Sequence, residues 1–473
     1  GVLLYAPHPA YGTPDELRAL VDAAHGHGLM VLVDVVYNHF GPEGNYLHAY
    51  CPEFFDDTQT TPWGPAINFD GDHASAVRAF MVHNARYWVR EFHVDGLRMD
   101  AVHAMHPRAT EAIVREICAA VRAEAGDTRP IHVVLENDAN EARLLSRNAA
   151  GVVVCATGQW NDDLHHAAHV MLTGQSDGYY SDFANQPRAL FAQALAEGFI
   201  YQGQASAYRD GAARGEASTT LPLQAFVSFL QTHDQVGNRA LGERLHQLAD
   251  PLQVRTALAC VLLSPHVPML FMGEEFAAST PFLYFCDFGA ELGQQVAHGR
   301  RSEFGRFAAF ASEAARLTIP DPNAPSSMAD SQLRWDELHH APHQQWHAFV
   351  QTLLAVRRTA LFPLLAQGCH SGQASWSDDA LQVRWSLGRP GAPATGQLHL
   401  RAFFGTGPAS GVAPAPGRLL FGHGIDATDP AGWVLQAGAV AVTYAPAEPG
   451  VARGVPRQQL AAGDSLHQEP THG

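Results

Sequence analysis

An arginine and an aspartate have the residue types and the spacing of a nucleophile that is held in its ionised form. Arg98 and Asp100 lie two residues apart at the end of the run 93–100, which has the apolar character of a short buried strand. Residues two apart in a strand point to the same face. The guanidinium should therefore keep the carboxylate of Asp100 ionised, as covalent glycosyl transfer requires. An Arg-x-Asp pair alone is also a common structural ion pair.

Two further carboxyl groups follow apolar runs that predict strands. Glu136 ends the run 131–136, and the interval from Asp100 fits one strand-helix-strand unit whose helix spans 110–125, with Thr110 as a candidate N-cap. Asp234 ends the run 229–234. Parallel strands with right-handed crossovers place their carboxyl ends side by side. A carboxyl group at the end of an apolar strand tends to have a raised pKa, which suits a general acid.

Three carboxylates at one rim favour a function over a structural role, because like charges that are gathered together cost free energy. Each of them alone is equally typical of a helix cap or an ion pair. The run 29–36 predicts another strand, which delivers Asp34, Asn38 and His39 to the same rim. These side chains either hold the site together or form a satisfied polar network under a loop.

The elements that must position these groups alternate between strands and helices. Predicted strands end near Val36, Met99, Leu135, Ala156, Gln231 and Met272, and predicted helices include 14–26, 74–91 and 251–263. This order is typical of an α/β fold, a (β/α)8 TIM barrel that here lacks the first strands. The catalytic domain would span 1–365, with the helix 346–357 packed on the barrel wall.

A smaller C-terminal domain follows the predicted barrel. Short alternating runs separated by Gly and Pro predict a small antiparallel β-sandwich domain over 375–446. Residues 447–473 are rich in Pro, Gly and Gln and are predicted to be a disordered tail.

Composition narrows the classes of partner and compartment. The chain of 473 residues has a net charge of −17, which disfavours nucleic acid and anionic membranes as partners. All its basic residues other than histidine are arginines, and the absence of lysine excludes Schiff-base chemistry and a lysine-containing phosphate loop. Six widely spaced cysteines predict free thiols, and no leader or apolar run of about 18 residues occurs, so a cytoplasmic location is expected.

Several runs resemble known families. Residues 34–39, 95–100, 136 and 233–234 resemble the four ordered motifs of the alpha-amylase superfamily of retaining glycoside hydrolases, and 66–71 resembles its additional motif. Within that superfamily, five segments resemble in sequence the malto-oligosyltrehalose trehalohydrolase family: 5–13, 36–46, 159–166, 233–244 and 272–288. The resemblance covers about residues 1 to 365.

The resemblance implies a role for each matching residue. Asp100 would be the nucleophile, Glu136 the general acid and base, and Asp234 the residue that stabilises the transition state. Substrate-binding residues would be Arg98, His39, His233, Asp34, Asn38, His103, Asn161, Asp162 and Gln235. The implied substrate is a maltooligosyl trehalose, a maltodextrin whose end is trehalose, and the α-1,4 bond next to that trehalose would be cut. No cofactor or required metal is expected, and the protein would be a monomer or homodimer.

The resemblance also implies that two barrel strands and an N-terminal immunoglobulin-like domain are missing. A barrel without two strands has unpaired edges, so a weakly active or inactive fragment is expected. Two alternatives to a trehalose-releasing hydrolase stay open. One is a glycogen branching or debranching enzyme, which uses the same three acids, and the other is an inactive carbohydrate-binding fragment. For His165, His166 and His169, sugar binding or helix packing is favoured over a metal site.

Overall fold

A parallel sheet of six strands forms the centre of the computed structural model, which describes residues 3–41, 44–61, 64–105, 110–127, 129–305, 308–428 and 432–447. The strand order is β1 (Leu32–Val35), β4 (Gly96–Met99), β5 (His132–Leu135), β6 (Gly158–Trp160), β9 (Phe226–Ser228) and β10 (Val267–Pro268). All five neighbouring pairs are parallel. The predicted α/β fold with a parallel sheet is confirmed, and β1 and β10 are the edge strands among the described residues.

The helices follow the strands as the alternating pattern predicts. Those with the predicted bounds are α1 (Pro14–Gly26), α3 (Ala74–Glu91), α4 (Thr110–Ala125) and α9 (Pro251–Leu263). Other elements around the sheet are α2 (Leu47–Tyr50), α5 (Asp162–Thr173), α6 (Pro187–Glu197), α7 (His233–Gly237), α8 (Leu245–Leu248), α10 (Ala290–Phe304), α11 (Glu313–Arg316) and α12 (Pro325–Asp330). Two short hairpins complete this part, β2 (Phe55–Thr61) with β3 (Gly64–Ile67) and β7 (Gln204–Ala205) with β8 (Ala213–Arg214).

Local capping explains why two of these helices begin where they do. Thr13 accepts a hydrogen bond from the backbone N–H of Glu16, whose carboxylate accepts one from the N–H of Thr13, and Pro14 occupies the first turn. The Asp250 side chain accepts hydrogen bonds from the N–H groups of two residues in the first turn of α9. Such caps satisfy N–H groups that have no partner within the helix.

The fourth strand of the sheet, β6, lies later in the chain than its predicted end at Ala156. The N–H of Ala156 bonds to the carbonyl of Leu144, and Arg147 donates to the carbonyls of Ala156 and Thr157. The carbonyls at 156–157 are therefore already bonded to the preceding loop, and the first bond to the parallel sheet runs from the N–H of Thr157 to the carbonyl of Val133. The sheet resumes at Gly158, where a Cβ atom would lie 3.1 Å from the carbonyl oxygen of Ala225.

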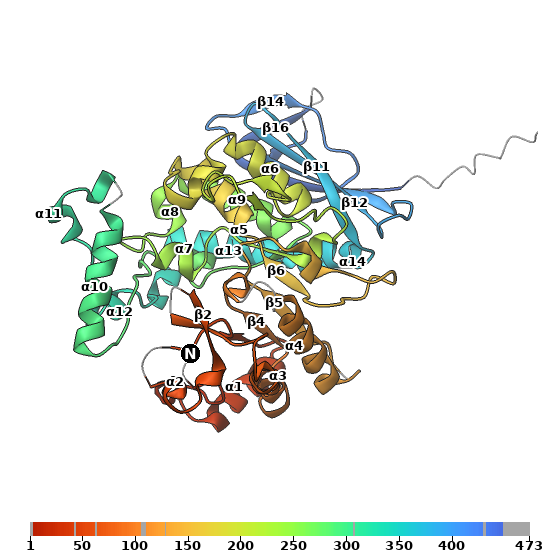
Figure 1. The fold of residues 1–473 in the computed structure, drawn as a ribbon. Coiled ribbons are helices and arrows are strands. Elements are labelled where there is room, and N and C mark those ends of the chain that lie inside the picture. The colour runs from red at the N-terminus through yellow and green to blue at the C-terminus, as the bar shows by residue number, and fades with distance from the viewer. Residues whose placement is uncertain are drawn as a thin grey trace, which may run out of the picture.

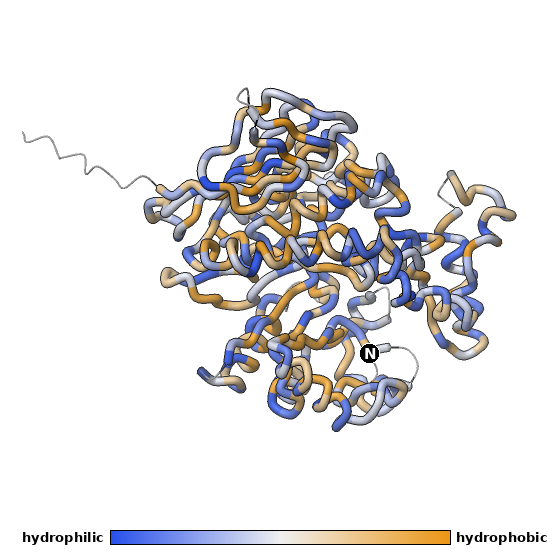
Figure 2. Tube along the Cα trace, turned by 180° about the vertical axis from the view of Figure 1, so that it is seen from behind, coloured by the Kyte–Doolittle hydropathy of each residue, from blue (hydrophilic) through white to orange (hydrophobic). Residues whose placement is uncertain are grey.

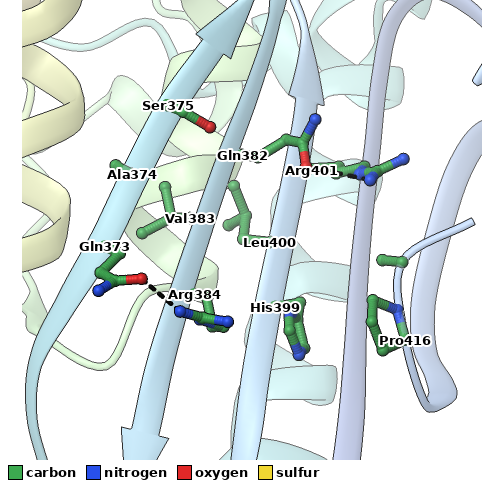
Figure 3. Close-up of a pocket in the computed structure, with 11 residues that line it drawn as sticks. Gln373, Ala374, Ser375, Gln382, Val383, Arg384, His399, Leu400, Arg401 and Pro416 are labelled. Carbon is green, nitrogen blue, oxygen red and sulfur yellow. Dashed lines mark hydrogen bonds between the residues drawn. The ribbon is translucent and has the colours of Figure 1, made fainter. Parts of the chain in front are cut away.

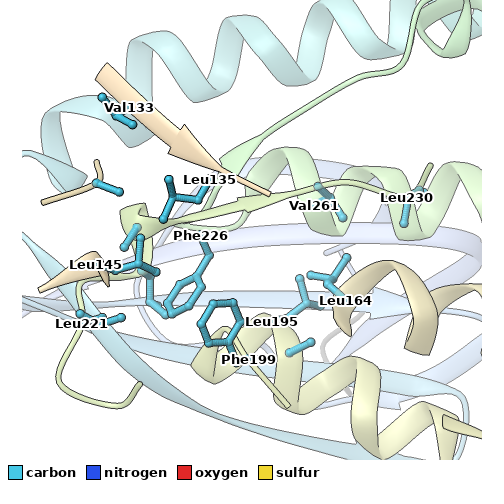
Figure 4. Close-up of a cluster of buried hydrophobic side chains, with 14 of the residues drawn as sticks. Val133, Leu135, Leu145, Leu164, Leu195, Phe199, Leu221, Phe226, Leu230 and Val261 are labelled. Carbon is cyan, nitrogen blue, oxygen red and sulfur yellow. The ribbon is translucent and has the colours of Figure 1, made fainter. Parts of the chain in front are cut away.

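The main hydrophobic core lies between the sheet and the helices on its faces. Figure 4 shows one part of it, in which Phe226 of β9 lies against Phe199, and Val133 and Leu135 of β5 belong to the same cluster. In the hydropathy view, orange segments concentrate in the interior and blue segments at the periphery (Figure 2). Most of α9 is buried, and the helix contacts the C-terminal sheet (Figure 1).

The C-terminal domain is an antiparallel sheet in the order β11 (Cys369–Ser377), β12 (Ala380–Leu387), β13 (Gly396–Phe403), β16 (Trp433–Pro446) and β14 (Ala409–Val412), with β15 (Arg418–Asp426) paired to β16. It begins six residues before the predicted boundary at 375, since β11 is too rich in Ser, Gly and Gln to show an apolar alternation. Trp385 anchors the sheet to α6 by donating a hydrogen bond to the carbonyl of Leu195. The predicted disordered tail lies, from residue 448 onward, outside the described residues.

One long helix runs from Ala341 to Leu365 and comprises α13 (Ala341–Val356), a π-helical turn (Arg357–Leu361) and α14 (Phe362–Leu365). Its length and composition would suffice to cross a membrane. Here Trp346, Val350 and Leu353 are buried in the core, and the helix contacts α9. The predicted packing of this helix on the barrel wall is confirmed.

The π-helical turn points Arg357 inward, and this arginine is expected to be a strong determinant of stability. Its guanidinium donates hydrogen bonds to the carbonyls of Leu262, Ser264 and His266 at the end of α9. Arg357→Ala would leave these buried acceptors without partners, so the free energy of unfolding should fall by about 2–4 kcal/mol. Urea denaturation measures this change. The exposed neighbour provides the control: Arg358→Ala should change stability by less than about 0.5 kcal/mol, and equal effects of the two variants would contradict the assignment.

Candidate active site

One guanidinium binds three carboxylates at the carboxyl ends of β1, β4 and β5. Arg98 is almost fully buried, and its Nη1 atom lies 2.9 Å from Oδ1 of Asp34 and 2.7 Å from Oδ1 of Asp100. Its Nη2 atom lies 2.9 Å from Oε2 of Glu136. The sheet register explains this cluster, because Asp34, Arg98 and Val134 are aligned across the three strands. Asp100 and Glu136 each follow two residues later and so lie on the same face.

Asp100 is held through both of its carboxylate oxygens. Its Oδ1 atom accepts a hydrogen bond from Arg98, and its Oδ2 atom accepts one of 3.2 Å from Nδ2 of Asn38. The same amide group donates to the backbone carbonyl of Asp100 at 2.9 Å. Asn38 is buried, and its Oδ1 atom contacts the ring of His39. This arrangement fixes the orientation of a carboxylate that is still 26% exposed.

Glu136 lies in an environment that favours its protonated form. Burial is the main cause that raises the pKa of this carboxyl group to about 7. The charge of Arg98 and a 2.8 Å hydrogen bond from the N–H of Ala101 both act in the opposite direction, but burial prevails. A group with this pKa is able both to give and to take a proton near neutral pH.

Asp234 lies in the first turn of α7 and not at the end of a strand, because β9 already ends at Ser228. The negative charges of Asp100 and Asp234 both raise the pKa of Glu136, because both carboxylates lie near that group. The carboxylate of Asp234 is 45% exposed, and its Oδ1 atom lies 3.6 Å from Nε2 of His233. The structure therefore brings together the three acids that the sequence places at strand ends.

The indole of Trp160 lies against the buried guanidinium. The central carbon of Arg98 is 4.1 Å from the centroid of the Trp160 ring, and His233 meets the same ring at 6.1 Å. Such a contact stabilises a buried cation. The contact of Trp160 with Arg98 depends on the register between β4 and β6, for which the sequence carries no signal.

Asp162 and Gln235 form a second polar contact beside the three acids. The side-chain amide of Gln235 donates to Oδ1 of Asp162 at 3.4 Å, and its oxygen accepts from the N–H of Thr232 at the start of α7. Asp162 is buried, and burial raises the pKa of its carboxyl group to about 8, with the charge of Glu136 adding to the effect. Asp162 is therefore mainly protonated at neutral pH.

Sequence reasoning missed the buried ion pair between Asp163 and Arg214. The two side chains are 0% and 5% exposed, and Nη1 of Arg214 lies 2.8 Å from Oδ1 of Asp163. Oδ2 of Asp163 accepts hydrogen bonds from the N–H groups of Ile200 and Tyr201 and from the amide of Asn140. The pair ties the start of α5 to the loop after α6. Its only sequence signal is the doubled acid Asp162-Asp163 at a helix N-terminus.

Two predicted substrate-binding residues contact other parts of the protein. Asn161 is fully buried, and its amide donates to the carbonyl of Gly198 at 3.1 Å. His103 is partly exposed, and its Nε2 atom lies 3.8 Å from Oδ1 of Asp138. Among the hydrogen bonds between described residues, neither side chain bonds to the three acids, and their roles as substrate contacts stay predictions.

The three histidines of α5 are packed inside the protein. His165 bonds to the carbonyl of Leu230 and to the hydroxyl of Tyr180, and His169 stacks on the ring of Tyr180 with centroids 4.2 Å apart. Within the described ranges, no three His, Cys, Asp or Glu side chains gather closely enough to hold a metal ion. These contacts favour helix packing as the role of the histidines.

Comparisons with known proteins agree with one another. The chain is 38% identical to the malto-oligosyltrehalose trehalohydrolase of Arthrobacter ramosus over 409 residues, and 41% identical to that of Deinococcus radiodurans over 361 residues. Among solved structures, a 1.4 Å crystal structure of a Salmonella typhimurium protein described as a candidate alpha amylase matches with a TM-score of 0.85 and 41% identity. No family model matches the chain.

Coverage differs between the two sides of each match. The aligned part covers 85% of this chain for the first relative, 76% for the second and 94% for the crystal structure. The chain spans 69% of the length of the Arthrobacter ramosus protein, 57% of the Deinococcus radiodurans protein and 73% of the crystallised protein.

Proposed function

Since this chain belongs to the malto-oligosyltrehalose trehalohydrolase family, we propose that it is a retaining glycoside hydrolase that releases trehalose from maltooligosyl trehalose. The bond cut is the α-1,4-glucosidic bond next to the terminal trehalose. The observation that carries the proposal is the cluster in which Arg98 binds both Asp100 and Glu136. A retaining mechanism needs two carboxyl groups about 5–5.5 Å apart, and a shared guanidinium supports such a separation because its terminal nitrogens are fixed side by side.

In the first step, Oδ2 or Oδ1 of Asp100 attacks the anomeric carbon while the glycosidic bond breaks. Glu136 donates its proton to the departing oxygen, so that trehalose leaves with a complete hydroxyl group. The bonds from Arg98 and Asn38 hold Asp100 in the attacking orientation. Asp234 accepts hydrogen bonds from hydroxyls of the sugar in the cleavage subsite as positive charge develops on that sugar.

In the second step, water replaces trehalose in the site. Glu136 is now ionised and takes a proton from this water. At the same time the oxygen of the water attacks the anomeric carbon and displaces Asp100. Two inversions give net retention of the α configuration. The pKa of about 7 for Glu136 supports both roles within a narrow pH range.

Product identity is the test of the proposed function. Maltotriosyl trehalose should yield trehalose and maltotriose, which chromatography separates, and NMR of early time points should show the new reducing end in the α form. Turnover is expected to be slow, because the edge strands β1 and β10 expose Leu32 (38%) and Val267 (41%). New α-1,6 linkages formed from amylose would instead identify a branching enzyme, and binding without any bond cleavage would identify a carbohydrate-binding remnant.

We also propose a cellular location and an oligomeric state for the protein. The six cysteines are free, and four of them are buried. Free thiols support a reducing compartment, the cytoplasm, as the location of the protein. The polymeric substrate requires no second subunit, and a monomer or homodimer is the proposed state, which sedimentation velocity measures.

A further inference from the structure

A cavity of about 610 Å³ lies on the C-terminal sheet, and none of its lining residues belongs to the catalytic cluster. Its polar lining consists of side chains on three adjacent strands, with Ala415 and Pro416 at one side: Gln373 and Ser375 of β11, Gln382 and Arg384 of β12, and His399 and Arg401 of β13. Figure 3 shows Gln373, Arg384 and His399 side by side across these strands.

Strand alternation explains why polar groups gather on this face. Leu381, Val383 and Trp385 of β12 point into the main core, where Trp385 bonds to α6. Gln382 and Arg384 alternate with them and therefore point to the opposite face. The same alternation on β13 sends His399 and Arg401 to that face. The polar floor of the cavity is thus built by the sheet, and the loop between β14 and β15 closes one side through Ala415 and Pro416.

The cavity holds positive charge without a compensating acid. Arg384 donates a hydrogen bond to Oε1 of Gln373, and Arg401 donates to Oε1 of Gln382 at 3.0 Å and to the carbonyl of Ala413. No carboxylate forms an ion pair with either guanidinium in the described part of the chain. The amides orient the arginines but do not neutralise them. Such a cluster is unusual in a chain whose net charge is −17.

The imidazole of His399, which lies opposite Arg384 and two residues before Arg401, has an unpaired polar atom. Nε2 of His399 is enclosed and has no hydrogen-bond partner among the residues that the structure describes. Burial and the charges of Arg384 and Arg401 together lower the pKa of this ring. Buried polar atoms normally have a partner, and an unpaired one points to a group that binds there.

We propose that this cavity is a binding site for a phosphate group, bound by Arg384, His399 and Arg401. Arginine forks bind phosphate oxygens through charge-assisted hydrogen bonds. Diagonal neighbours on adjacent strands lie roughly 7–8 Å apart, which leaves room for one tetrahedral anion between the two guanidiniums. The amide N–H groups of Gln373 and Gln382 supply further donors, since their oxygens are already used by the arginines. Among the described residues, no Phe, Tyr or Trp side chain lines the cavity, so a stacked neutral sugar fits it less well.

Isothermal titration calorimetry tests the site without any use of enzyme activity. Inorganic phosphate and a hexose monophosphate are titrated separately into the 473-residue chain at fixed ionic strength. Saturable binding of at least one of them is expected at millimolar concentration or below, and tighter binding of the hexose monophosphate would identify a phosphorylated sugar as the source of the group. Arg384→Gln should weaken the affinity by at least about tenfold, which is 1.4 kcal/mol.

Matched variants separate the site from general charge effects. Arg389 is exposed on the same domain and does not line the cavity, so Arg389→Gln should leave the affinity unchanged. His399→Gln should weaken binding without removing a guanidinium. Equal losses in Arg384→Gln and Arg389→Gln would overturn the proposal, as would the absence of saturable binding. Maltohexaose binding that is lost in Arg384→Gln would assign the cavity to neutral sugar instead.

Discussion

Asp100→Asn should reduce kcat by a factor on the order of 10⁴ or more, because an amide cannot form the covalent intermediate. Asparagine preserves the shape of the side chain, and its oxygen is still able to accept the hydrogen bond from Arg98. The loss would therefore report the missing nucleophile and not a collapsed site. Trehalose release from maltotriosyl trehalose, measured at saturating substrate, gives the comparison with the unmodified chain.

Asp34→Asn is the matched control for this experiment. Asp34 binds the same Nη1 atom of Arg98 at 2.9 Å but is 53% exposed and is not the proposed nucleophile. Its replacement should lower kcat by less than about 10²-fold, which corresponds to the loss of a positioning contact.

Azide added to Asp100→Ala should restore turnover and form a β-glycosyl azide, since the small anion attacks from the face that the carboxylate has left. Full activity of Asp100→Asn would contradict the proposed mechanism.

The sequence predicts the positions of Asp100 and Glu136 because each directly follows an apolar run that forms a strand. For Asp234 the predicted strand is wrong, since β9 ends at Ser228 and Asp234 lies in α7. The sequence also predicts the bounds of α1 and α9, because proline and a capping residue mark where each helix begins. These signals are local, in that one short segment carries all the information. Parallel-strand geometry then places Asp100 and Glu136 at one rim.

Contacts that join distant segments could not be predicted in this way. The ion pair of Asp163 with Arg214 and the stacking of Arg98 on Trp160 depend on how strands and helices are aligned in three dimensions. Asn161 illustrates the same limit. Its place at the end of an apolar strand suggests the rim, but its amide is committed to the carbonyl of Gly198 in the interior.

The long strand β16 shows why the C-terminal domain was only partly predicted. Two short apolar runs, 433–436 and 440–444, form one continuous strand that contains Gly438 with a φ of 75°. A Cβ atom at this glycine would lie 2.5 Å from the side chain of Leu252 in α9. The glycine therefore marks the close packing of the two domains and not a turn between two strands.

Glu136→Gln should reduce kcat/KM on maltotriosyl trehalose by about 10²–10⁴-fold, because the departing oxygen loses its proton donor. The unmodified chain needs Glu136 protonated for the first step, and burial raises the pKa of this group to about 7. Its activity should therefore fall as pH rises through about 7. The glutamine variant has no group to titrate, so this alkaline limb should disappear from its pH profile.

A substrate with a good leaving group separates the role of the acid from damage to the site. In a short maltodextrin whose reducing end carries an α-fluoride, the fluoride leaves with little help from a proton donor, so Glu136→Gln should release fluoride in its first turnover at a rate much closer to that of the unmodified chain. Later turnovers should stay slow, because the variant also lacks the base that activates water. Asp100→Asn should lose activity on both substrates, because both need this nucleophile to form the covalent intermediate. Equal losses on the two substrates in Glu136→Gln would show that this carboxyl group supports the structure of the site and is not the acid.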